Sequence, residues 1–346
     1  MASIPATNAQ IEPVATWQVM LAGVDITSRF DPKLLTLRIS QSRQEKADKL
    51  SIELDDADGK LVLPPANATL MVSLGWARGS GVPVGIVGMG TYVVDDIEWS
   101  GPPDRVTINA HSADMRDSFR TRKTRTWTAQ TLGAITAQIA GEQGLTPRCH
   151  PDLSGITVSA AEQHNQSDME FLRNLGRRYD AVATVKAAAV ILAPMNATTT
   201  ATGATLPAVA INRQSGDHVT YRRSAREGTY KGAEANWHDQ DGATRQLHHE
   251  GDAPRKRLKR IYATQSDAQA AAQSEHQRQQ RVAASLDVSL AYGNAQIAPG
   301  QRASVSGYKA EINATSWTVS TTEHQMGPGG FTTTLTLEVA GEGSSD

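Results

Sequence analysis

The sequence predicts a β-rich α+β fold, and three observations support this prediction. Apolar and polar residues alternate along many short segments, first between residues 14 and 115 and again after residue 284. This alternation is typical of strands with one buried face. Two segments in the middle of the chain instead place apolar residues at helical spacing. Thr, Ala, Val and Gly are plentiful and aromatic residues make up only 5% of the chain, which suits many short strands.

Length and charge limit the function classes. A chain of 346 residues predicts two or three compact units, at roughly 100 to 200 residues per domain. Its 34 basic and 36 acidic residues nearly cancel, so neither nucleic acid nor an anionic membrane is expected as the main partner. Cys149 is the single cysteine, which excludes an intramolecular disulfide framework and metal sites that need several thiolates.

No segment of the sequence resembles a membrane span or a secretion signal. No apolar run approaches the roughly 18 residues that cross a bilayer, and the first residues, MASIPATNAQIEP, lack a basic and then apolar pattern. The chain is therefore expected to be made and kept in a cytoplasm.

The first β unit is expected over residues 14–115, after a flexible lead at 1–13. Turn formers at 55–60 and 64–67 separate its strands, and SGPPD joins the last two, GTYVVDDIEW and RVTINA. A sandwich or small barrel with one buried face per strand follows from this pattern. The alternating apolar positions are Trp17, Val19, Leu21, Leu35, Leu37, Ile39, Leu50, Ile52, Leu54, Leu70, Val72 and Leu74.

Residues 116–200 predict a small α+β unit. After the basic stretch at 120–127, Thr128 is expected to cap a helix with a buried stripe and an end at Gly144. Ser167 and Glu170 form a capping box for a second helix. The continuous run at 181–194 predicts a strand or hairpin. The apolar stripes of the two helices are Leu132, Ile135 and Ile139, then Phe171, Leu175 and Tyr179.

A second β unit is expected over residues 201–340, after the polar crossing at 197–207. A long Ala- and Gln-rich helix, at about 266–284, opens at Ser266 with Gln269 in the box position and interrupts its strands. The tail at 341–346 is expected to be loose. Its alternating positions are Leu286, Val288, Leu290, Trp317, Val319, Phe331, Thr333, Leu335, Leu337 and Val339.

Gly-Pro turns recur in the two β units, at Gly101-Pro102 and at Gly327-Pro328. In both places a strand reaches the turn and returns as a cleanly alternating strand. Duplicated β domains and a chance similarity of two hairpins both explain this echo.

Histidines and acidic residues gather at 238–249, where His238, Asp239, Asp241, His248 and His249 lie among Gly, Gln and Thr. Their spacing matches no tight helical ligand pattern, so solvated loop residues are favoured over a metal site. Cys149 and His150 are adjacent, and an imidazole can lower a thiol pKa. Neighbouring residues of a strand point to opposite faces, however, so a catalytic pair is disfavoured.

A glycosidase needs two carboxylates that face each other across a cleft. The available ones are Glu142, Glu162, Glu170 and Asp180; capping explains Glu170, and the others lie in polar loops or on helix surfaces. No nucleophile elbow, dinucleotide loop or phosphate loop stands between a strand and a helix. We therefore predict no catalytic, cofactor-binding or metal-binding residues and no cofactor.

Two basic clusters allow a contact with phosphate or with an acidic neighbour. One is RKRLKR, from Arg255 to Arg260, and the other contains Arg222, Arg223 and Arg226. Because no aromatic residues are interleaved with these cations, solvated strands are favoured over a nucleic-acid surface.

Several segments together resemble the phage late control gene D protein family, which comprises tail hub proteins of contractile phages related to the hub part of type VI secretion spike proteins. Residues 195–255 match less clearly. The segments that carry the resemblance are GTYVVDDIEWSGPPDRVTINAHSADM, KTRTWTAQTLGAITAQIAGEQGLTP, QSDMEFLRNLGRRYDAVATVKAAAVILAP, RIYATQSDAQAAAQSE, LDVSLAYGNAQIAPGQRASVSGY and WTVSTTEHQMGPGGFTTTLTLEVAG.

The resemblance implies two tube-like antiparallel β-barrels with inserted α+β parts, assembled as a homotrimer. Six barrels in three chains would adapt a sixfold tail tube to a threefold spike. The implied partners are two further copies of the chain, the tail spike protein, the tail tube protein and neighbouring baseplate proteins. Nucleic acid would only pass through the channel, and no stable membrane insertion is expected. The implied location is the virion, in the phage tail baseplate, after assembly in the host bacterial cytoplasm.

Two other functions are open at this point. A tail-associated peptidoglycan hydrolase is the first alternative, because tail tips must cross the cell wall. A β-sandwich that binds carbohydrate or a receptor is the second, and it requires a cleft with stacked aromatic rings. The six Trp and seven Tyr residues are dispersed along the chain, which disfavours this binder.

Overall fold

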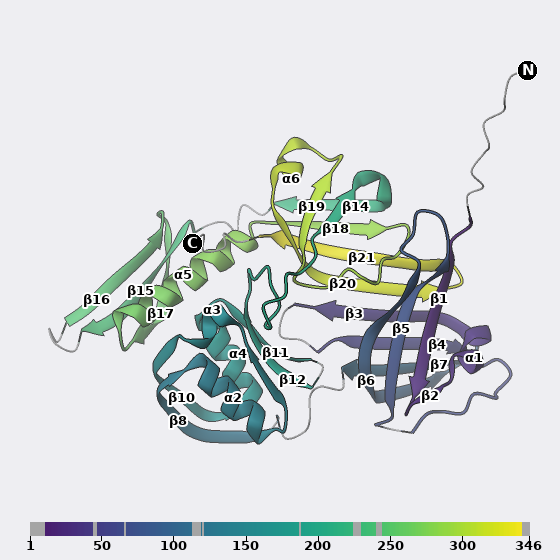
Figure 1. Cartoon of the computed structure of the whole chain (residues 1–346), viewed down its shortest axis with the longest axis horizontal. Coiled ribbons are helices and arrows are strands. Elements are labelled where there is room, and N and C mark those ends of the chain that lie inside the picture. Colours follow the sequence, from purple (N-terminus) through teal and green to yellow (C-terminus); the bar gives the residue numbers. More distant parts are fainter. Residues whose placement is uncertain are drawn as a thin grey trace, which may run out of the picture.

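The computed structural model confirms the β-rich α+β class. It describes residues 11–43, 47–65, 67–112, 119, 121–186, 188–223, 230–239 and 244–340. Most of the expected flexible lead and the whole expected loose tail lie outside these residues. Four separate clusters of buried apolar side chains hold the chain together, and Figure 1 shows the parts that they stabilise.

The first β unit is built around the apolar positions that alternate in the sequence. Leu37, Ile39, Leu50, Ile52 and Leu74 are all 1% exposed or less, so the predicted buried faces are confirmed. The order of its strands in the sheet is β3-β4-β7-β6-β5-β1-β2. Its elements are β1 Val14–Leu21, β2 Val24–Asp25, α1 Thr27–Phe30, η1 Asp31–Lys33, β3 Leu34–Ser42, β4 Lys49–Asp55, β5 Thr69–Arg78, β6 Gly85–Ser100 and β7 Arg105–Ser112.

The middle of the chain folds around its own apolar cluster, in which two helices pack with short strands. Strand β8 pairs antiparallel with β10, and β12 lies between β11 and β9, so the run at 181–194 is a hairpin. The elements are β8 Arg122–Thr131, α2 Leu132–Glu142, β9 Thr146–Cys149, α3 Pro151–Ser154, β10 Thr157–Ser167, α4 Asp168–Arg178, β11 Ala181–Lys186 and β12 Ala189–Pro194.

The cap of α2 differs from the prediction. Thr131, not Thr128, caps the helix, and its Oγ1 accepts a hydrogen bond of 3.1 Å from the N–H of Ala134. Residue 128 remains in β8 because that strand pairs with β10 as far as Thr131. The cap of α4 is confirmed, since the Ser167 hydroxyl accepts a bond of 3.2 Å from the Glu170 N–H.

The second β unit has its own apolar cluster around Trp317, Val319, Leu286 and Leu337. Its strand order is β14-β18-β21-β20, with β19 paired to β20 and β13 paired to β19. Its elements are β13 Val209–Asn212, η3 Arg213–Ser215, β14 Gly216–Arg223, β18 Ala284–Leu290, β19 Arg302–Ser306, α6 Ala310–Ala314, β20 Trp317–Gly327 and β21 Gly330–Val339.

Residues 232–239 and 244–281 belong to a separate arm inserted between β14 and β18, at the left of Figure 1. Three strands, β15 Gly232–Asp239, β16 Thr244–Gly251 and β17 Arg255–Tyr262, make a sheet of their own that packs against α5, Gln265–Arg281. Buried Ala268, Ala271 and Ala272 line the helix face in contact with this sheet.

Helix α5 begins and ends slightly earlier than predicted. Thr264, not Ser266, caps it, accepting a bond of 3.2 Å from the Asp267 N–H, and the helix ends at Arg281 and not near 284. Within the described residues, the helices are too short or too polar to span a bilayer.

The two β units share one strand order. When the six longer strands of each unit are numbered along the chain, their spatial order is 2-3-6-5-4-1 in both: β3-β4-β7-β6-β5-β1 and β14-β18-β21-β20-β19-β13. All the pairings are antiparallel except β13 with β19, which is parallel where its counterpart, β1 with β5, is antiparallel. This shared order favours duplication over a chance similarity of hairpins.

Within the described residues, one strand pairing joins the two units into one sheet. Strand β20 of the second unit pairs antiparallel with β3 of the first, so that β14-β18-β21-β20-β3-β4-β7-β6 form one row of eight strands. Figure 1 shows the strands of the second unit continuing those of the first. We call this row the joined sheet.

Gly75 and Gly88 provide a test of the packing within the first unit. A Cβ on Gly75 would lie 1.8 Å from the carbonyl oxygen of Gly85, whereas a Cβ on Gly88 would meet nothing within 4 Å. Gly75→Ala is therefore expected to lower the free energy of unfolding by about 3 kcal/mol, the upper end of the usual range for overpacked substitutions. Gly88→Ala should change it by less than about 1 kcal/mol. Chemical denaturation of both variants measures this, and equal effects would contradict the described β5–β6 contact.

Candidate functional site

The seam between β3 and β20 is where the two β units meet. Its register runs from Leu37 opposite Met326 to Ser42 opposite Thr321. Leu37 and Met326 are buried on the core side. On the other side, the Arg38 guanidinium lies 3.1 Å from the Glu323 carboxylate. Backbone hydrogen bonds therefore join the units, and side chains on both faces match across the seam.

Strand β20 changes its partner within its own length. Trp317 and Thr318 pair with β19, whereas residues from Thr321 onward pair with β3. Between them, the Ser320 carbonyl accepts a hydrogen bond of 2.9 Å from the Arg43 N–H. One edge of β20 thus serves both β units, because the strand is long enough to hold a partner from each.

Aromatic side chains hold the units together beside the seam. The Trp76 indole N–H, from the first unit, donates a hydrogen bond of 2.7 Å to the Gly293 carbonyl of the second. The Trp76 ring also lies 5.6 Å from Phe331 and 5.8 Å from Tyr292, between ring centroids. These contacts add apolar burial and aromatic packing to the strand pairing.

The face of the joined sheet that points away from the apolar cores is polar along its whole width. Ion pairs cross it at Arg38–Glu323 and, over 2.8 Å, at Arg105–Glu53. A hollow of about 340 Å³ lies over β3, β4 and β7. The outward residues are His218, Thr220, Arg222, Ser285, Asp287, Ser289, Thr332, Thr334, Thr336, Glu338, Thr321, Glu323, Gln325, Thr36, Arg38, Ser40, Lys49, Ser51, Glu53, Arg105, Thr107, Asn109, His111, Asp96 and Glu98.

Carboxylates outnumber ammonium and guanidinium groups on this polar face. Three of its cations, Arg38, Arg105 and Arg222, lie within 3.3 Å of a carboxylate of the same face. A polyanion such as nucleic acid binds where cationic side chains are free to replace its counterions. The face is therefore suited to stay hydrated and not to retain a polyanion.

His324 lies on the buried side of the seam, opposite Ile39. Its side chain is 0% exposed, and its Nδ1 is 2.9 Å from the Thr333 hydroxyl. Burial lowers the pKa of His324 to about 4, because a charged imidazole loses its hydration there. The seam therefore contains a neutral histidine at physiological pH.

Charged groups connect the other parts of the chain to the seam. The Arg43 guanidinium donates a hydrogen bond of 3.2 Å to the Pro194 carbonyl at the end of β12. Burial, and then the nearby positive charges of Arg281 and Arg302, lower the pKa of Arg43 to about 10. Arg281 of α5 in turn forms a buried ion pair with Asp180, which precedes β11. Breaking such a pair leaves an uncompensated buried charge, at a cost of about 3 to 5 kcal/mol.

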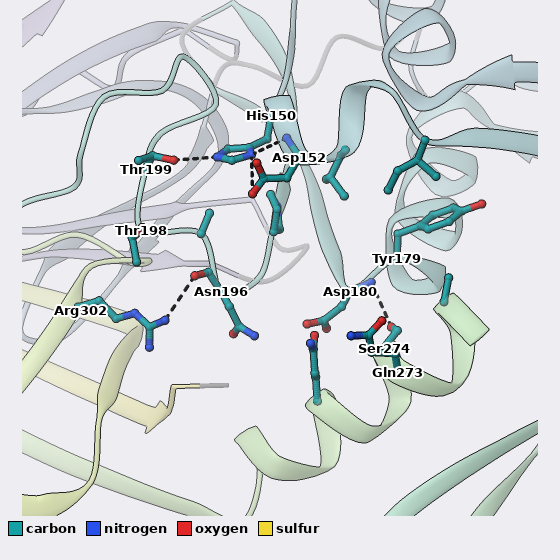
Figure 2. A pocket seen from close by; sticks show the side chains of 16 residues that line it. His150, Asp152, Tyr179, Asp180, Asn196, Thr198, Thr199, Gln273, Ser274 and Arg302 are labelled. Atoms are coloured by element: carbon teal, nitrogen blue, oxygen red, sulfur yellow. Dashed lines mark hydrogen bonds and ion pairs between the residues drawn. The ribbon is translucent and has the colours of Figure 1, made fainter. Parts of the chain in front are cut away.

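A polar cleft of about 470 Å³ lies where these parts meet (Figure 2). His150, Asp152 and Tyr179 line one side, and Gln273 and Ser274 of α5 line another. The segment with Asn196 to Thr199 and the side chain of Arg302 close the remaining sides. The cleft thus contains hydrogen-bonding groups from the α+β part, the arm and the second β unit.

The cleft does not bring together the groups of a hydrolase. His150 is held in place, because its Nε2 lies 2.8 Å from the Thr199 hydroxyl and its Nδ1 accepts from the Asp152 N–H. Asp180 is engaged by Arg281. The Asp152 carboxylate is 67% exposed and 3.5 Å from the His150 ring. Among the described residues that line the cleft, the other carboxylate is Asp180, which its ion pair with Arg281 holds, whereas a glycosidase needs two carboxylates that face each other across the substrate.

The adjacent Cys149 and His150 have separate roles. Burial raises the pKa of the Cys149 thiol to about 11, so the thiol stays protonated at neutral pH and is a poor nucleophile. His150 follows the end of β9 and caps the short helix α3. The structure places the two residues at consecutive positions without a nucleophile–base contact between them.

The four carboxylates considered for a glycosidase do not form a pair. Glu142 is bound to Lys123 at 2.8 Å and to Arg125 at 2.7 Å. Burial acts to raise the pKa of Glu142, but hydrogen bonds from Lys123, Gln138 and Arg125 outweigh it and leave the pKa lowered. Glu162 and Glu170 are exposed on β10 and α4, and Asp180 pairs with Arg281.

Asp168 is a buried charge that the sequence analysis missed. Its side chain is 0% exposed and receives hydrogen bonds from Lys123 at 2.7 Å and Arg125 at 2.6 Å. Gln163 and Gln143 complete its shell at 3.0 and 3.1 Å. Burial alone would raise the pKa of Asp168, yet these donors leave it lowered. The alternation of Lys123 and Arg125 on one strand face was the available signal.

The histidine cluster lies in the β15–β16 hairpin, and Asp241 falls outside the described residues. His238 is opposite Arg245, and His248 is opposite Ala235. His249 is opposite Glu234, 3.7 Å from its carboxylate, and shares a face with His238, whereas His248 lies on the other face. Among the described residues, no group of three or more His, Cys, Asp or Glu side chains could hold a metal ion.

The basic stretch 255–260 forms most of β17, and acidic neighbours engage part of it. Lys256 lies 2.7 Å from Glu275, and Arg257 lies 2.5 Å from Glu234. Of the second basic cluster, Arg222 pairs with Asp287 at 3.3 Å, Arg223 is exposed at the end of β14, and Arg226 lies outside the described residues.

Comparison with known proteins places this architecture among tail proteins. The family model described as "Phage tail baseplate hub (GPD)" matches residues 56–329. A curated relative from Escherichia phage P2, named "Probable baseplate hub protein", is 32% identical over 364 residues, covering 93% of this chain and 92% of its own.

Solved structures show the same fold at low sequence identity. The 43 kDa tail protein of prophage MuSo2 from Shewanella oneidensis has a TM-score of 0.67 at 13% identity, covering 93% of this chain and 97% of that chain. An E. coli component of the type VI secretion system has a TM-score of 0.56 at 11% identity, covering 95% and 77%.

His324 makes the seam sensitive to acid. The pKa of His324 is lowered in the folded chain, whereas in the unfolded chain it is about 6.5. As the pH falls below about 6.5, the unfolded chain therefore binds the proton more readily than the folded chain, and the free energy of unfolding decreases. With a folded pKa of about 4, the free energy of unfolding should fall by about 2 kcal/mol between pH 7 and pH 5 on account of this residue. Urea unfolding of the wild type and of His324→Gln at both pH values measures this. A loss of the same size in the variant would contradict it.

Proposed function

Because the chain belongs to the phage tail baseplate hub family, we propose that it is a trimeric structural adaptor that joins a sixfold tail tube to a threefold spike. The observation that carries this proposal is the common strand order of the two β units. Three chains with two like units each present six similar surfaces around one axis, whereas the chains themselves repeat three times. Such an assembly can meet both symmetries.

The proposal assigns a role to each part of the chain. Residues 14–115 and 201–340 act as two tube-like β-barrels, and residues 116–200 as an α+β domain at their side. Two apolar clusters support this division, one built mostly from the first β unit and one from the second, with Ala295, Met326 and Phe331 of the second unit joining the first cluster. The seam supports it as well, since it holds the units at a defined angle to each other.

The proposed partners are two further copies of the chain, the spike protein, the tail tube protein and neighbouring baseplate proteins. The proposed location is the baseplate of the virion, after assembly in the host bacterial cytoplasm. The name of the phage P2 relative supports this location. The hydrated, acidic polar face of the joined sheet suits a channel wall past which nucleic acid moves without binding.

We propose that the role is structural and not enzymatic. The thiol of Cys149 is kept protonated, and Glu142 and Asp180 are held by arginine and lysine side chains. These groups stabilise the fold where a hydrolase would leave them free to exchange protons. The family and the P2 relative carry the names of structural proteins.

Imaging of the purified chain tests the adaptor. With the cognate spike protein added, native mass spectrometry is expected to find three copies of the chain per complex, and electron micrographs should show a threefold ring with a central channel. The chain alone at low concentration serves as the control, since assembly depends on mass action. Compact monomers that persist after the spike protein is added would contradict the proposal.

A zymogram tests the absence of turnover. The purified chain is expected to leave a peptidoglycan gel uncleared, as is Glu142→Gln, while lysozyme in the next lane clears it. A clear zone that Glu142→Gln or Asp180→Asn abolishes would instead support the peptidoglycan hydrolase.

A further inference from the structure

We propose that β6 of one copy pairs antiparallel with β14 of the next copy, with Ile97 opposite Val219 and Asp96 opposite Thr220. This pairing rests on the proposed trimer and names the strands that close it. The observation behind it is that the joined sheet ends in two free strand edges whose counterparts are already paired inside the chain.

The two free edges lie at opposite ends of the joined sheet. Strand β14 pairs with β18 on one side only. Strand β6 pairs with β7 along residues 92–100, but with β5 only as far as Val93. Within the described part of the chain, no strand covers the second edge of β14 or the β5-side edge of β6 beyond Val94. Uncovered strand edges offer unpaired N–H and C=O groups to another chain.

The β3–β20 pairing inside the chain is the equivalent of the proposed β6–β14 pairing between copies. When the six longer strands of each unit are numbered along the chain, β20 is strand 5 of the second unit and β3 is strand 2 of the first. The fifth strand of the first unit is β6, and the second strand of the second unit is β14. A single chain can make the first of these two equivalent contacts but not the second. The next copy supplies the second, as quasi-equivalent units require.

The registers inside the chain give the register between copies. The paired residues next to the two Gly-Pro turns are Ser100 with Arg105 and Gly327 with Gly330. Three positions before the last paired residues, Ser100 and Gly327, lie Ile97 on β6 and His324 on β20, and His324 is opposite Ile39 in the seam.

The equivalent of Ile39 follows from the remaining ladders. Ile39 is opposite Leu50, which is opposite Ala110, five residues after Arg105. In the second unit, the matching path runs from Leu335, five residues after Gly330, to Val288 and then to Val219. Val219 therefore takes the place of Ile39, and Ile97 faces it across the proposed interface.

The side chains at the two edges are complementary in this register. Ile97 and Val219 each pack at the margin of their own apolar cluster, so their contact would continue the core from one copy to the next. On the polar side, exposed Asp96 and Glu98 would face His218, Thr220 and Arg222. The seam has the same polarity, with the acidic residue on β20 and the basic residue on β3. A one-residue slip would place apolar side chains against charged ones.

Strand direction also permits the ring to close. Every neighbouring pair in the eight-stranded row is antiparallel, so β14 and β6 at its ends run in opposite directions. Placing β14 of the next copy beside β6 therefore continues the alternation without a parallel pair. The contact joins two different edges, so copies add head to tail and can close into a ring under a threefold axis.

Disulfide trapping tests this pairing. In a Cys149→Ala background, which contains no other cysteine, Asp96→Cys and Thr220→Cys are introduced together. Directly opposite residues of paired strands have Cβ atoms about 4.5 to 5.5 Å apart, close enough for a disulfide after a small adjustment. After native mass spectrometry has confirmed the trimer, mild oxidation should convert most of the chain to covalent dimers and trimers on a non-reducing gel. The pair Glu98→Cys with His218→Cys tests the same register two positions along the edge.

Matched controls separate the possible outcomes. Each single variant should remain monomeric on the gel, and a mixture of the two single variants should give dimers but no trimers. The pair Asp96→Cys with Thr334→Cys, on the interior strand β21, should not cross-link. A trimer whose two matched pairs both fail to cross-link would overturn this interface but leave the adaptor intact. Cross-linking by Asp96→Cys alone would show a twofold contact and overturn the interface as well. A chain that forms no trimer would overturn the adaptor and, with it, this pairing.

Discussion

The backbone hydrogen bonds between β3 and β20 are the constraint on which the rest of the structure depends. The N–H and C=O groups of an exposed strand edge can hydrogen-bond to water, but an unpaired edge beside an apolar core readily pairs with another strand. Here the edge of β3 is covered by β20 from the far end of the chain, which fixes how the two β units face each other. The Trp76–Gly293 hydrogen bond and the contact between the Trp76 and Phe331 rings depend on that arrangement of the two units.

Apolar contacts stabilise the individual parts of the chain, and charged contacts link several of these parts to one another. Each part has its own buried apolar cluster, whereas ion pairs and hydrogen bonds make several of the links between parts. Arg43 binds the carbonyl of Pro194, and Arg281 binds Asp180. Contacts of this kind are directional, so they orient the parts, but they add less stability than the apolar clusters because the charges lose their hydration. The cleft in Figure 2 lies among these links.

The two β units are alike in strand order yet differ in what is inserted between their strands. The arm, with its own sheet and helix α5, lies between β14 and β18, and the α+β part separates the two units along the chain. The last pairing of the second unit is parallel and not antiparallel. For the proposed adaptor, the common core would give six similar surfaces to one partner, and the different insertions would give three distinct surfaces to another. The two units thus share the strand order of their sheets and differ in the segments inserted between the strands.

The sequence by itself determined most strands of the two β units and which of their side chains are buried, but it did not predict β8, β9 or β10 of the α+β part. Alternation at Leu50, Ile52 and Leu54, or at Leu286 and Val288, has one interpretation because the side-chain period of a strand is two. Helix starts were not determined by the sequence, since a hydroxyl at Thr128 or at Thr131 can cap a helix equally well, and only the pairing of β8 with β10 distinguishes them. Only the tertiary structure decided that β20 pairs with β3, that β15, β16 and β17 form a separate sheet, and that Asp168 is buried beside Lys123 and Arg125. The physical reason is that backbone donors and acceptors are the same in every strand. An alternating pattern therefore states that a strand has a partner without stating which one, and that choice depends on the packing of residues far apart in the chain.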